Sequence, residues 1–338
     1  MTAPPDRPPQ DFLAGSRKRV AEPVSYRVRR DGKFFRLGDE KFTLKGVTYG
    51  PLAGEDGSPF ASIEKTRRDF ELIKALNANC IRIYHTPEPW FLELAVEFGL
   101  KIFLDVAWSK HVVFTEDQSI MEQARHAVRD AARSCGNHPA IFAISVVNEI
   151  PPDIVRYLGA QPIAHFVDEL CDIVKALAPD CLVTFANFPT TEYLQPRDVD
   201  FVTFNVYLHD PTTLRNYLMR LQHIAGEKPL VLGEYGIDSM QEDNEDGQAK
   251  RIGAQIASAY EEGVAGAFVF AFTDEWHVHG YTIDNWMFGL TRADRSLKSS
   301  YFAIQDVFAR APQTTELSKL PKVSVIICSY NGASTVES

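Results

Sequence analysis

Short apolar runs alternate with longer amphipathic segments between residues 43 and 309. The apolar runs predict eight strands: 43–49, 80–84, 101–106, 141–147, 181–186, 200–206, 229–234 and 266–272. The segments with helical period predict seven helices: 61–77, 89–99, 117–135, 155–178, 211–225, 246–263 and 297–309. The pattern after the fifth strand, near Thr190–Leu194, is weaker. Apolar strands that each precede a helix indicate a parallel sheet covered on both faces.

Eight such units predict an α/β fold, a (β/α)8 TIM barrel that closes on itself. An open, doubly wound sheet is the alternative, but it usually has fewer strands and a glycine-rich first turn, and the chain has no GxGxxG motif. Before the first unit, the stretch "YRVRRDGKFFRLGDEKFTLKG" alternates around Asp31-Gly32. This pattern predicts a short N-terminal β-hairpin.

The two ends of the chain differ from this repeating pattern. Residues 1–22 are rich in Pro, Asp and Arg and predict a disordered segment. The barrel with its hairpin is expected over 23–311, and the polar stretch 312–321 is expected to be a linker. The first twenty residues contain no apolar signal region, and no apolar run reaches the ~20 residues needed to span a bilayer.

The net charge and the cysteines limit the classes of binding partner and the cellular compartment that we expect. The formal net charge of −10 argues against nucleic acid or an anionic membrane as the main partner. The five cysteines are odd in number and form no CxxC pair, so we interpret them as reduced thiols of a cytoplasmic protein. No cofactor motif is present, and we expect neither a cofactor nor a metal.

Two of the predicted strands end on a glutamate. The stretch "FAISVVNEIPP" ends its strand on Asn148-Glu149, and "KPLVLGEYG" ends its strand on Glu234. The two glutamates are three β/α units apart, so they would face each other across the carboxyl-terminal mouth of the barrel. Two facing carboxylates suit cleavage of a glycosidic bond, one as acid and one as nucleophile or base. The alternative is that each glutamate only pairs with a nearby Arg or Lys.

These motifs carry a family resemblance over roughly residues 24–309. "HPAIFAISVVNEIP" resembles the acid/base motif on the fourth strand of clan A glycoside hydrolases, and "KPLVLGEYG" resembles their nucleophile motif on the seventh. Five further strands, the first, second, third, sixth and eighth, resemble theirs in the same order, in "LKGVTYGP", "NCIRIYHTPEP", "FGLKIFLDV", "VDFVTFNVY" and "FVFAFTDEW". The chain is most similar to the family 2 and family 5 barrels. No β-sandwich precedes the barrel, so substrate preferences of multidomain family 2 enzymes are not carried over.

The resemblance implies roles for six residues. Glu149 would be the acid/base and Glu234 the nucleophile of a retaining mechanism. Four residues would bind substrate or hold the nucleophile: Asn148 at the sugar 2-hydroxyl, Arg82 and Tyr207 beside Glu234, and Trp276 under the cleaved sugar.

Further aromatic and histidine residues lie near predicted strand ends or loops. Three tryptophans are candidate subsites, with core packing as the alternative: Trp90, Trp108 and Trp286. Three residues are candidate binders of sugar hydroxyls, with a structural role as the alternative: Tyr49, His85 and His209. The stretch "DEWHVHG" offers two histidines beside two carboxylates, but without a third ligand at set spacing it favours sugar contact or solvation over a metal.

The final stretch, "PKVSVIICSYNGASTVES", resembles the opening strand of family 2 glycosyltransferases. We therefore interpret 322–338 as the first strand of a truncated, covalently linked glycosyltransferase domain. Such a domain uses nucleotide sugars, which also points to the cytoplasm. The alternative is a ninth strand packed on the barrel.

Together these observations predict a retaining β-glycoside hydrolase or transglycosylase acting on a β-linked glycan, with a β-glucan favoured. It would be part of a longer hydrolase–glycosyltransferase whose partner is carbohydrate, with no membrane contact by this segment. The alternative is a barrel that holds the glycan for the fused transferase without cutting it. The presence of both glutamates with Asn148, Arg82 and Tyr207 favours the enzyme.

Overall fold

The computed structural model describes residues 27–54, 57–240, 244–278 and 280–311. Three predictions concern segments outside these residues and stay predictions: the disordered segment 1–22, the linker 312–321 and the glycosyltransferase-like strand 322–338. Within the described residues no helix has the length and apolar character needed to cross a membrane.

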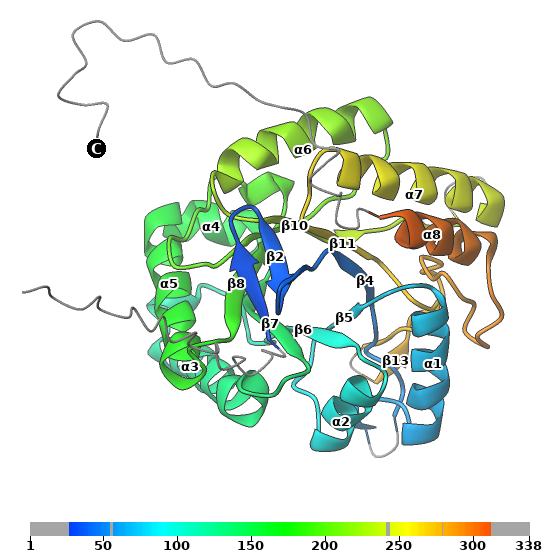
Figure 1. The fold of residues 1–338 in the computed structure, drawn as a ribbon. Helices are drawn as coiled ribbons and strands as arrows, with labels where there is room; N and C mark the ends of the chain where they lie inside the picture. Colours follow the sequence, from blue (N-terminus) through cyan, green and yellow to red (C-terminus); the bar gives the residue numbers. More distant parts are fainter. Residues whose placement is uncertain (1–26, 55–56, 241–243, 279, 312–338) are drawn as a thin grey trace, which may run out of the picture.

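Eight parallel strands form a closed barrel, in the order β10-β11-β4-β5-β6-β7-β8-β9 (Figure 1). Their bounds are β4 Leu44–Thr48, β5 Cys80–Ile83, β6 Lys101–Asp105, β7 Ile141–Asn148, β8 Leu182–Asn187, β9 Val202–Asn205, β10 Leu230–Tyr235 and β11 Gly266–Val269. Each strand falls within or overlaps its predicted range, so the predicted (β/α)8 barrel is confirmed.

The helices form a ring outside the strands (Figure 1). Their bounds are α1 Ile63–Ala75, α2 Pro89–Glu97, α3 Gln118–Ala131, α4 Pro152–Leu158, α5 Ala160–Leu177, α6 Pro211–Ala225, α7 Asn244–Glu261 and α8 Ser299–Arg310. The helix predicted over 155–178 is divided into α4 and α5, because Gly159 adopts φ 85 between them, a conformation that favours glycine. The weak segment after β8 forms only the 3-10 turn η4, Pro189–Thr191.

Side-chain caps mark where several helices begin. The Asp210 carboxylate accepts a hydrogen bond from the backbone nitrogen of Thr213 at 2.7 Å, and Pro211 occupies the first position of α6. Asp117 accepts from the backbone nitrogen of Ser119 at 2.8 Å at the start of α3. These contacts satisfy donors that the first helical turn leaves unpaired.

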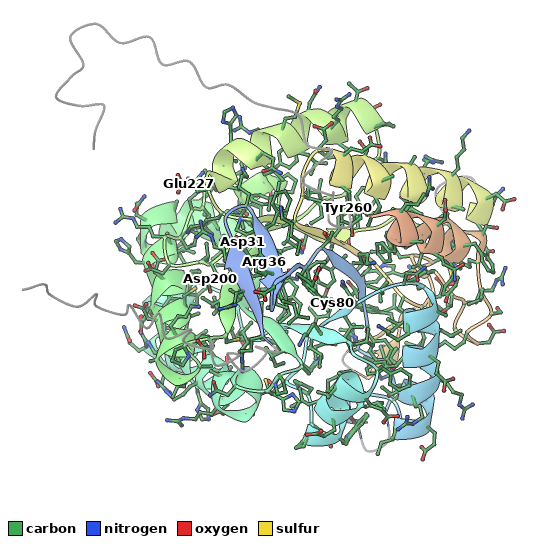
Figure 2. All side chains as sticks on the ribbon, viewed as in Figure 1. Asp31, Arg36, Cys80, Asp200, Glu227 and Tyr260 are labelled. Carbon is green, nitrogen blue, oxygen red and sulfur yellow. The ribbon has the colours of Figure 1, made fainter. Side chains whose placement is uncertain are left out.

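The predicted hairpin is confirmed and closes the amino-terminal end of the barrel. It consists of β1 Val28–Asp31 and β2 Phe34–Leu37, extended by β3 Glu40–Lys41, and it crosses the barrel opening in Figure 1. Phe35 is 0% exposed and meets Phe142 and Phe201 edge-on, with ring centroids 5.1 Å and 5.4 Å apart. Figure 2 shows the polar face of this hairpin, where Arg36 and Asp31 form an ion pair of 3.0 Å.

Alternation along the strands separates the barrel interior from the helix layer. On β5, Ile81 and Ile83 pack in the outer apolar cluster with the helices. Cys80 faces the inner cluster at the hairpin end, and Arg82 faces the interior one layer higher. On β5 an apolar residue at the hairpin end thus precedes a polar one towards the other mouth.

Two inward-facing glycines make room for large neighbours inside the barrel. A Cβ on Gly46 would lie 2.2 Å from the ring of Phe268. A Cβ on Gly233 would lie 2.8 Å from Nη1 of Arg82 and 2.6 Å from the Thr203 side chain. The Arg82 guanidinium therefore occupies the space that a side chain on β10 would otherwise fill.

Candidate active site

Arg82 is the centre of a polar network at the carboxyl-terminal end of the barrel. It is 0% exposed and donates through Nε to Asp105 on the next strand. Nη1 donates to Asn205 Oδ1 at 2.8 Å and lies 3.1 Å from Glu234 Oε1, while Nη2 donates to Asn148 Oδ1 at 3.0 Å. Burial opposes this charge, but the carboxylates of Asp105 and Glu234 outweigh it and raise the pKa of Arg82.

Glu234 ends β10 and accepts hydrogen bonds on both carboxylate oxygens. Tyr84 donates to Oε1 at 2.6 Å and Tyr207 donates to Oε2 at 2.8 Å. Burial, together with the charge of Glu234, raises the pKa of both tyrosines well above the usual range, so both remain donors. With Arg82 beside Oε1, these donors stabilise the negative charge of Glu234.

Glu149 follows β7 in a different environment. Its backbone has φ 45, a left-handed conformation that is uncommon for a residue with a side chain. Asn205 donates through Nδ2 to Glu149 Oε1 at 2.8 Å. Burial first, and then the charge of Glu234, raises the pKa of Glu149 above its ordinary value, against the opposing effects of Asn205, Lys110 and Arg82. Glu149 is therefore suited to hold a proton at a pH where an ordinary glutamate has lost it.

Asn205 and Arg82 connect the two glutamates. Asn205 uses its amide to donate to Glu149 Oε1 and to Asn148 Oδ1, and its own oxygen accepts from Arg82. Arg82 then contacts Glu234. The pair thus converges on one mouth of the barrel with opposite environments, which is the arrangement that separates an acid from a nucleophile.

Residues 28–311 match the family described as glycosyl hydrolases family 2, TIM barrel domain. The chain belongs to this family. The 1,3-beta-glucanosyltransferase gas5 of Schizosaccharomyces pombe is 23% identical over 323 residues, covering 86% of this chain and 63% of that protein. A beta-glucuronidase of Paenibacillus borealis is 24% identical over 234 residues, covering 63% of this chain and 38% of that protein.

The crystal structure of the Ruminococcus gnavus beta-glucuronidase has the same barrel, with a TM-score of 0.73 and 19% identity. The match covers 86% of this chain and 53% of that chain. The family 2 barrel described here therefore spans less than two thirds of the length of these relatives. At 19% sequence identity, this structural similarity shows that the two chains share the barrel fold.

Aromatic side chains line one side of the mouth of this family 2 barrel. Trp276 is 7% exposed, with its ring centroid 4.9 Å from that of Phe270 and 6.1 Å from that of Tyr84. Trp286 lies 6.3 Å from Trp276 and is 41% exposed. We call Phe270, Trp276, Trp286 and Phe288 the aromatic wall. Through Tyr84 the wall adjoins Glu234, and the role of Trp276 under the cleaved sugar stays a prediction.

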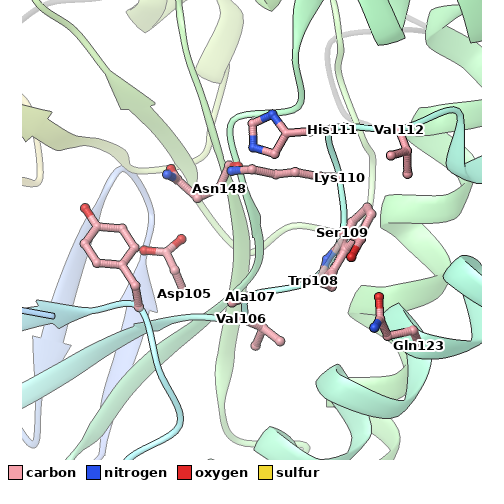
Figure 3. A pocket seen from close by; sticks show the side chains of 11 residues that line it. Asp105, Val106, Ala107, Trp108, Ser109, Lys110, His111, Val112, Gln123 and Asn148 are labelled. Carbon is pink, nitrogen blue, oxygen red and sulfur yellow. The ribbon is translucent and has the colours of Figure 1, made fainter. Parts of the chain in front are cut away.

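A cavity of about 600 Å³ opens over β6 and β7 (Figure 3). Its lining residues are Tyr84, Asp105, Val106, Ala107, Trp108, Ser109, Lys110, His111, Val112, Gln123 and Asn148. The predicted subsite residue Trp108 lies in this lining, and its indole nitrogen donates to the Val146 carbonyl at 2.9 Å. We call this space the β6–β7 cavity.

Other predicted site residues contact groups other than the two glutamates. Tyr49 was expected to bind a sugar hydroxyl, and this is wrong: the side chain is in the core and its hydroxyl donates to Asp69 at 2.9 Å. His85 lines a separate cavity of about 260 Å³. The ring of His209 packs edge-on against Tyr235. The indole nitrogen of Trp90 donates to Glu88 on the surface, at 3.0 Å.

The carboxylates of the "DEWHVHG" stretch belong to ion pairs. Asp274 pairs with Lys298 at 2.8 Å, and Glu275 pairs with Lys65 at 2.7 Å and with Arg295 at 2.6 Å. Among the residues that the structure describes, no group of three His, Cys, Asp or Glu side chains is arranged to hold a metal ion.

Four residues of the site were missed from the sequence: Tyr84, Asp105, Lys110 and Asn205. A signal existed for two of them. Tyr84 follows Arg82 by two residues, and Asn205 precedes Tyr207 by two, so each shares the inward face of its strand with a residue already singled out. Lys110 lies on a loop, where no periodicity could place it.

Proposed function

We propose that this family 2 barrel is a retaining β-glycoside hydrolase or transglycosylase that acts on a β-linked glycan. Glu234 is the nucleophile and Glu149 is the acid/base. The observation that carries the proposal is the contrast between the two carboxylates: Glu234 accepts from two tyrosines and contacts Arg82, while the pKa of Glu149 is raised.

In the first step, a carboxylate oxygen of Glu234 forms a bond to the anomeric carbon. The bond from that carbon to the leaving oxygen breaks, and Glu149 gives its proton to that oxygen. In the second step, water or a sugar hydroxyl gives a proton to Glu149 and attacks the anomeric carbon. The bond to Glu234 then breaks, and the carboxylate is restored.

The neighbouring residues prepare these steps. Asn148 Oδ1 accepts hydrogen bonds from Arg82 and Asn205, which orients the Asn148 amide nitrogen towards a ligand hydroxyl. Trp276 offers an aromatic face to the apolar C–H face of a pyranose ring. Tyr84 and Tyr207 fix the orientation of Glu234, which brings the nucleophile to the reaction with little reorganisation.

A β-glucan is the favoured substrate, supported by the similarity to a protein named as a 1,3-beta-glucanosyltransferase. The beta-glucuronidase relatives make a β-glucuronide the main competitor. The proposals of a linked glycosyltransferase domain and of a cytoplasmic location rest on residues 322–338 and on the cysteine usage. The four described cysteines are free and buried.

The test is paired substitution with analysis of intermediates. Glu234→Gln should abolish turnover of aryl β-glycosides and leave no covalent intermediate. Glu149→Ala should still react with substrates whose leaving group needs no proton, accumulate the intermediate, and form a β-glycosyl azide when azide is added. Products from β-glucans, β-mannans, β-galactosides and β-glucuronides identify the sugar.

A matched control is Glu227→Gln, which removes an exposed carboxylate shortly before the start of β10, the strand that Glu234 ends. It should retain wild-type turnover. Near-normal turnover by both Glu234→Gln and Glu149→Ala would overturn the catalytic proposal and favour a barrel that binds glycan without cutting it.

A further inference from the structure

The β6–β7 cavity adjoins the acid/base glutamate on the side away from the aromatic wall. It is lined by Asn148, which precedes Glu149, and by Tyr84, which donates to Glu234. Its volume of about 600 Å³ lies within the range of ~300–1,000 Å³ typical of small-molecule sites. The aromatic wall follows β11, while this cavity lies over β6 and β7, so Tyr84 on β5 lies between the two.

Lys110 extends across the inner end of this cavity. Figure 3 shows its side chain running from the loop after β6 towards Asn148, and its Nζ donates to the Asn148 carbonyl. The backbone nitrogen of Lys110 donates to the carbonyl of Trp108 at 2.9 Å, which fixes the turn of this loop. An ammonium group has three donors, and the Asn148 carbonyl accepts one of them. The others are suited to the hydroxyls of a bound sugar.

The remaining lining offers a rigid aromatic side chain and a polar one. Trp108 is held by its hydrogen bond to Val146 and packs edge-on against Phe114 and Phe166, with ring centroids 5.1 Å and 6.0 Å apart. Its orientation therefore does not need to be fixed by the ligand. Gln123 contributes an exposed amide from α3. A fixed indole, an amide and an ammonium together match the mixed apolar and hydroxyl surface of a sugar.

The charges at the inner end favour a neutral ligand. The charged groups that act on Lys110 are three carboxylates and one other cation: Glu149, Asp105, Glu234 and Arg82. Burial, and then the charge of Lys110, lowers the pKa of His111, so this imidazole is neutral near pH 7. With Glu149 protonated as the acid, the carboxylates of Asp105 and Glu234 balance the charges of Arg82 and Lys110, so no surplus positive charge is left to bind a carboxylate or phosphate on the ligand.

We propose that the β6–β7 cavity is the subsite for the leaving-group and acceptor sugar, that it takes a neutral β-linked sugar, and that Lys110 binds a hydroxyl of it. This inference rests on the proposed function. The leaving oxygen must lie beside Glu149, which protonates it, so the sugar that bears this oxygen occupies the adjoining cavity. In the return step the acceptor hydroxyl gives its proton to Glu149 and its oxygen bonds to the anomeric carbon, as the bond to Glu234 breaks.

The test measures how transfer depends on the acceptor. The 338-residue chain is given an activated aryl β-glycoside as donor and a β-1,3-linked glucose disaccharide as acceptor. Lys110→Met should raise the acceptor concentration for half-maximal transfer at least about tenfold, because a charged donor is lost, and Lys110→Arg should restore part of this. The effect should fall on this concentration more than on the maximal transfer rate.

Lys101→Met is the matched control. Lys101 begins the same strand, and its Nζ also donates to a backbone carbonyl, that of Pro139, at 2.8 Å, but at the hairpin end of the barrel. It should leave the acceptor dependence unchanged. An acceptor dependence for Lys110→Met within twofold of wild type would overturn the inference, as would equal transfer to a disaccharide carrying a uronic acid.

Binding separates this inference from the proposed function. Calorimetry with Glu234→Gln and with the double variant Glu234→Gln/Lys110→Met reports on the cavity without any turnover. Tighter binding of the disaccharide by the single variant supports the subsite even if the wild-type chain forms no covalent intermediate. Equal affinities, or no binding by the single variant, overturn it even if the wild-type chain is active.

Discussion

The two ends of the barrel bury their side chains equally well but fill the space with opposite chemistry. At the hairpin end, Phe35 is 0% exposed and packs against rings from the strands. One layer towards the other mouth, Arg82 is also 0% exposed but is surrounded by acceptors. Apolar packing tolerates partial rearrangement, whereas a buried charge depends on every partner.

Because of this difference, the hairpin end contributes mainly to stability, and the opposite end contributes to catalysis. Inside the barrel at the hairpin end, the groups stabilise through burial, as Phe35 does against the rings of Phe142 and Phe201. The opposite end contains groups that cost free energy to bury unless they are paired. A substitution at the hairpin end should therefore change stability alone, while one at the other end should change catalysis as well.

Arg82→Met should have the largest effect. It removes the charge that Asp105 and Glu234 face and the donor to Asn148 and Asn205. Breaking a buried pair typically costs 3–5 kcal/mol, and with four partners we expect a loss of about 5 kcal/mol in the free energy of unfolding. Urea denaturation measures this loss, and kcat/KM should fall with it.

The control for Arg82 is an arginine with an exposed partner. Arg125→Met removes an ion pair with Glu169 on the surface of the helix layer, which should contribute at most about 1 kcal/mol. If Arg82→Met unfolds at the same urea concentration as Arg125→Met, the buried network does not stabilise the barrel in the way described.

Phe35→Ala should have a large effect that is confined to stability. It leaves a cavity among Phe142 and Phe201, and such substitutions typically cost about 3–5 kcal/mol. Thermal or urea denaturation measures the loss. The kcat/KM per folded molecule should stay at the wild-type value, because the hairpin lies at the opposite end from Glu149 and Glu234. A fall in that value would show that the two ends are coupled.

The same contrast explains which parts of the fold and of the site could be predicted from the sequence. Continuous apolar strands at regular spacing predict the barrel, and the hairpin end follows from apolar alternation alone. Glu149 and Glu234 stand out because a charge at the end of an apolar run is unusual. The spacing of Tyr84 from Arg82 and of Asn205 from Tyr207 could indicate that they face inward, but their contacts in the network could not be predicted, since these form only when separate strands meet.

Two errors have local causes. Tyr49 directly follows β4, a position that site residues on other strands also occupy. Its hydroxyl, however, donates to Asp69 on α1, outside the barrel. At the end of a strand that is followed by a bend, the alternation of apolar and polar residues does not show which side chains point into the barrel. The break between α4 and α5 depends on the conformation of Gly159, and glycine is also tolerated inside helices at moderate cost.

Tyr207→Phe should reduce activity with little change in stability. Tyr207 as a whole is 38% exposed while its hydroxyl is buried against Glu234, so the ring stays in place but the donor to Glu234 Oε2 is lost. A hydrogen bond to a charged group contributes about 1.5–3 kcal/mol, so kcat/KM should fall by roughly 10- to 100-fold. Tyr157→Phe, at a tyrosine that is 68% exposed on α4, is the control and should behave as wild type. An equal loss in both variants would contradict the role of Tyr207.

The smallest expected effect is a shift of the alkaline limb of the pH profile. Burial and the charge of Glu234 raise the pKa of Glu149, so its protonated form persists above the ordinary value of about 4.3. For a substrate with a poor leaving group, kcat/KM should therefore fall as the pH rises through that raised pKa. Lys110 opposes the shift because its positive charge lowers the pKa of Glu149. Lys110→Met should thus move the limb to higher pH, by about one unit.

The measurement is kcat/KM against pH for both proteins, with a substrate whose leaving group needs no proton as the reference. That reference should lack the limb, and a limb that moves to lower pH in Lys110→Met would contradict the assignment of Glu149 as the acid.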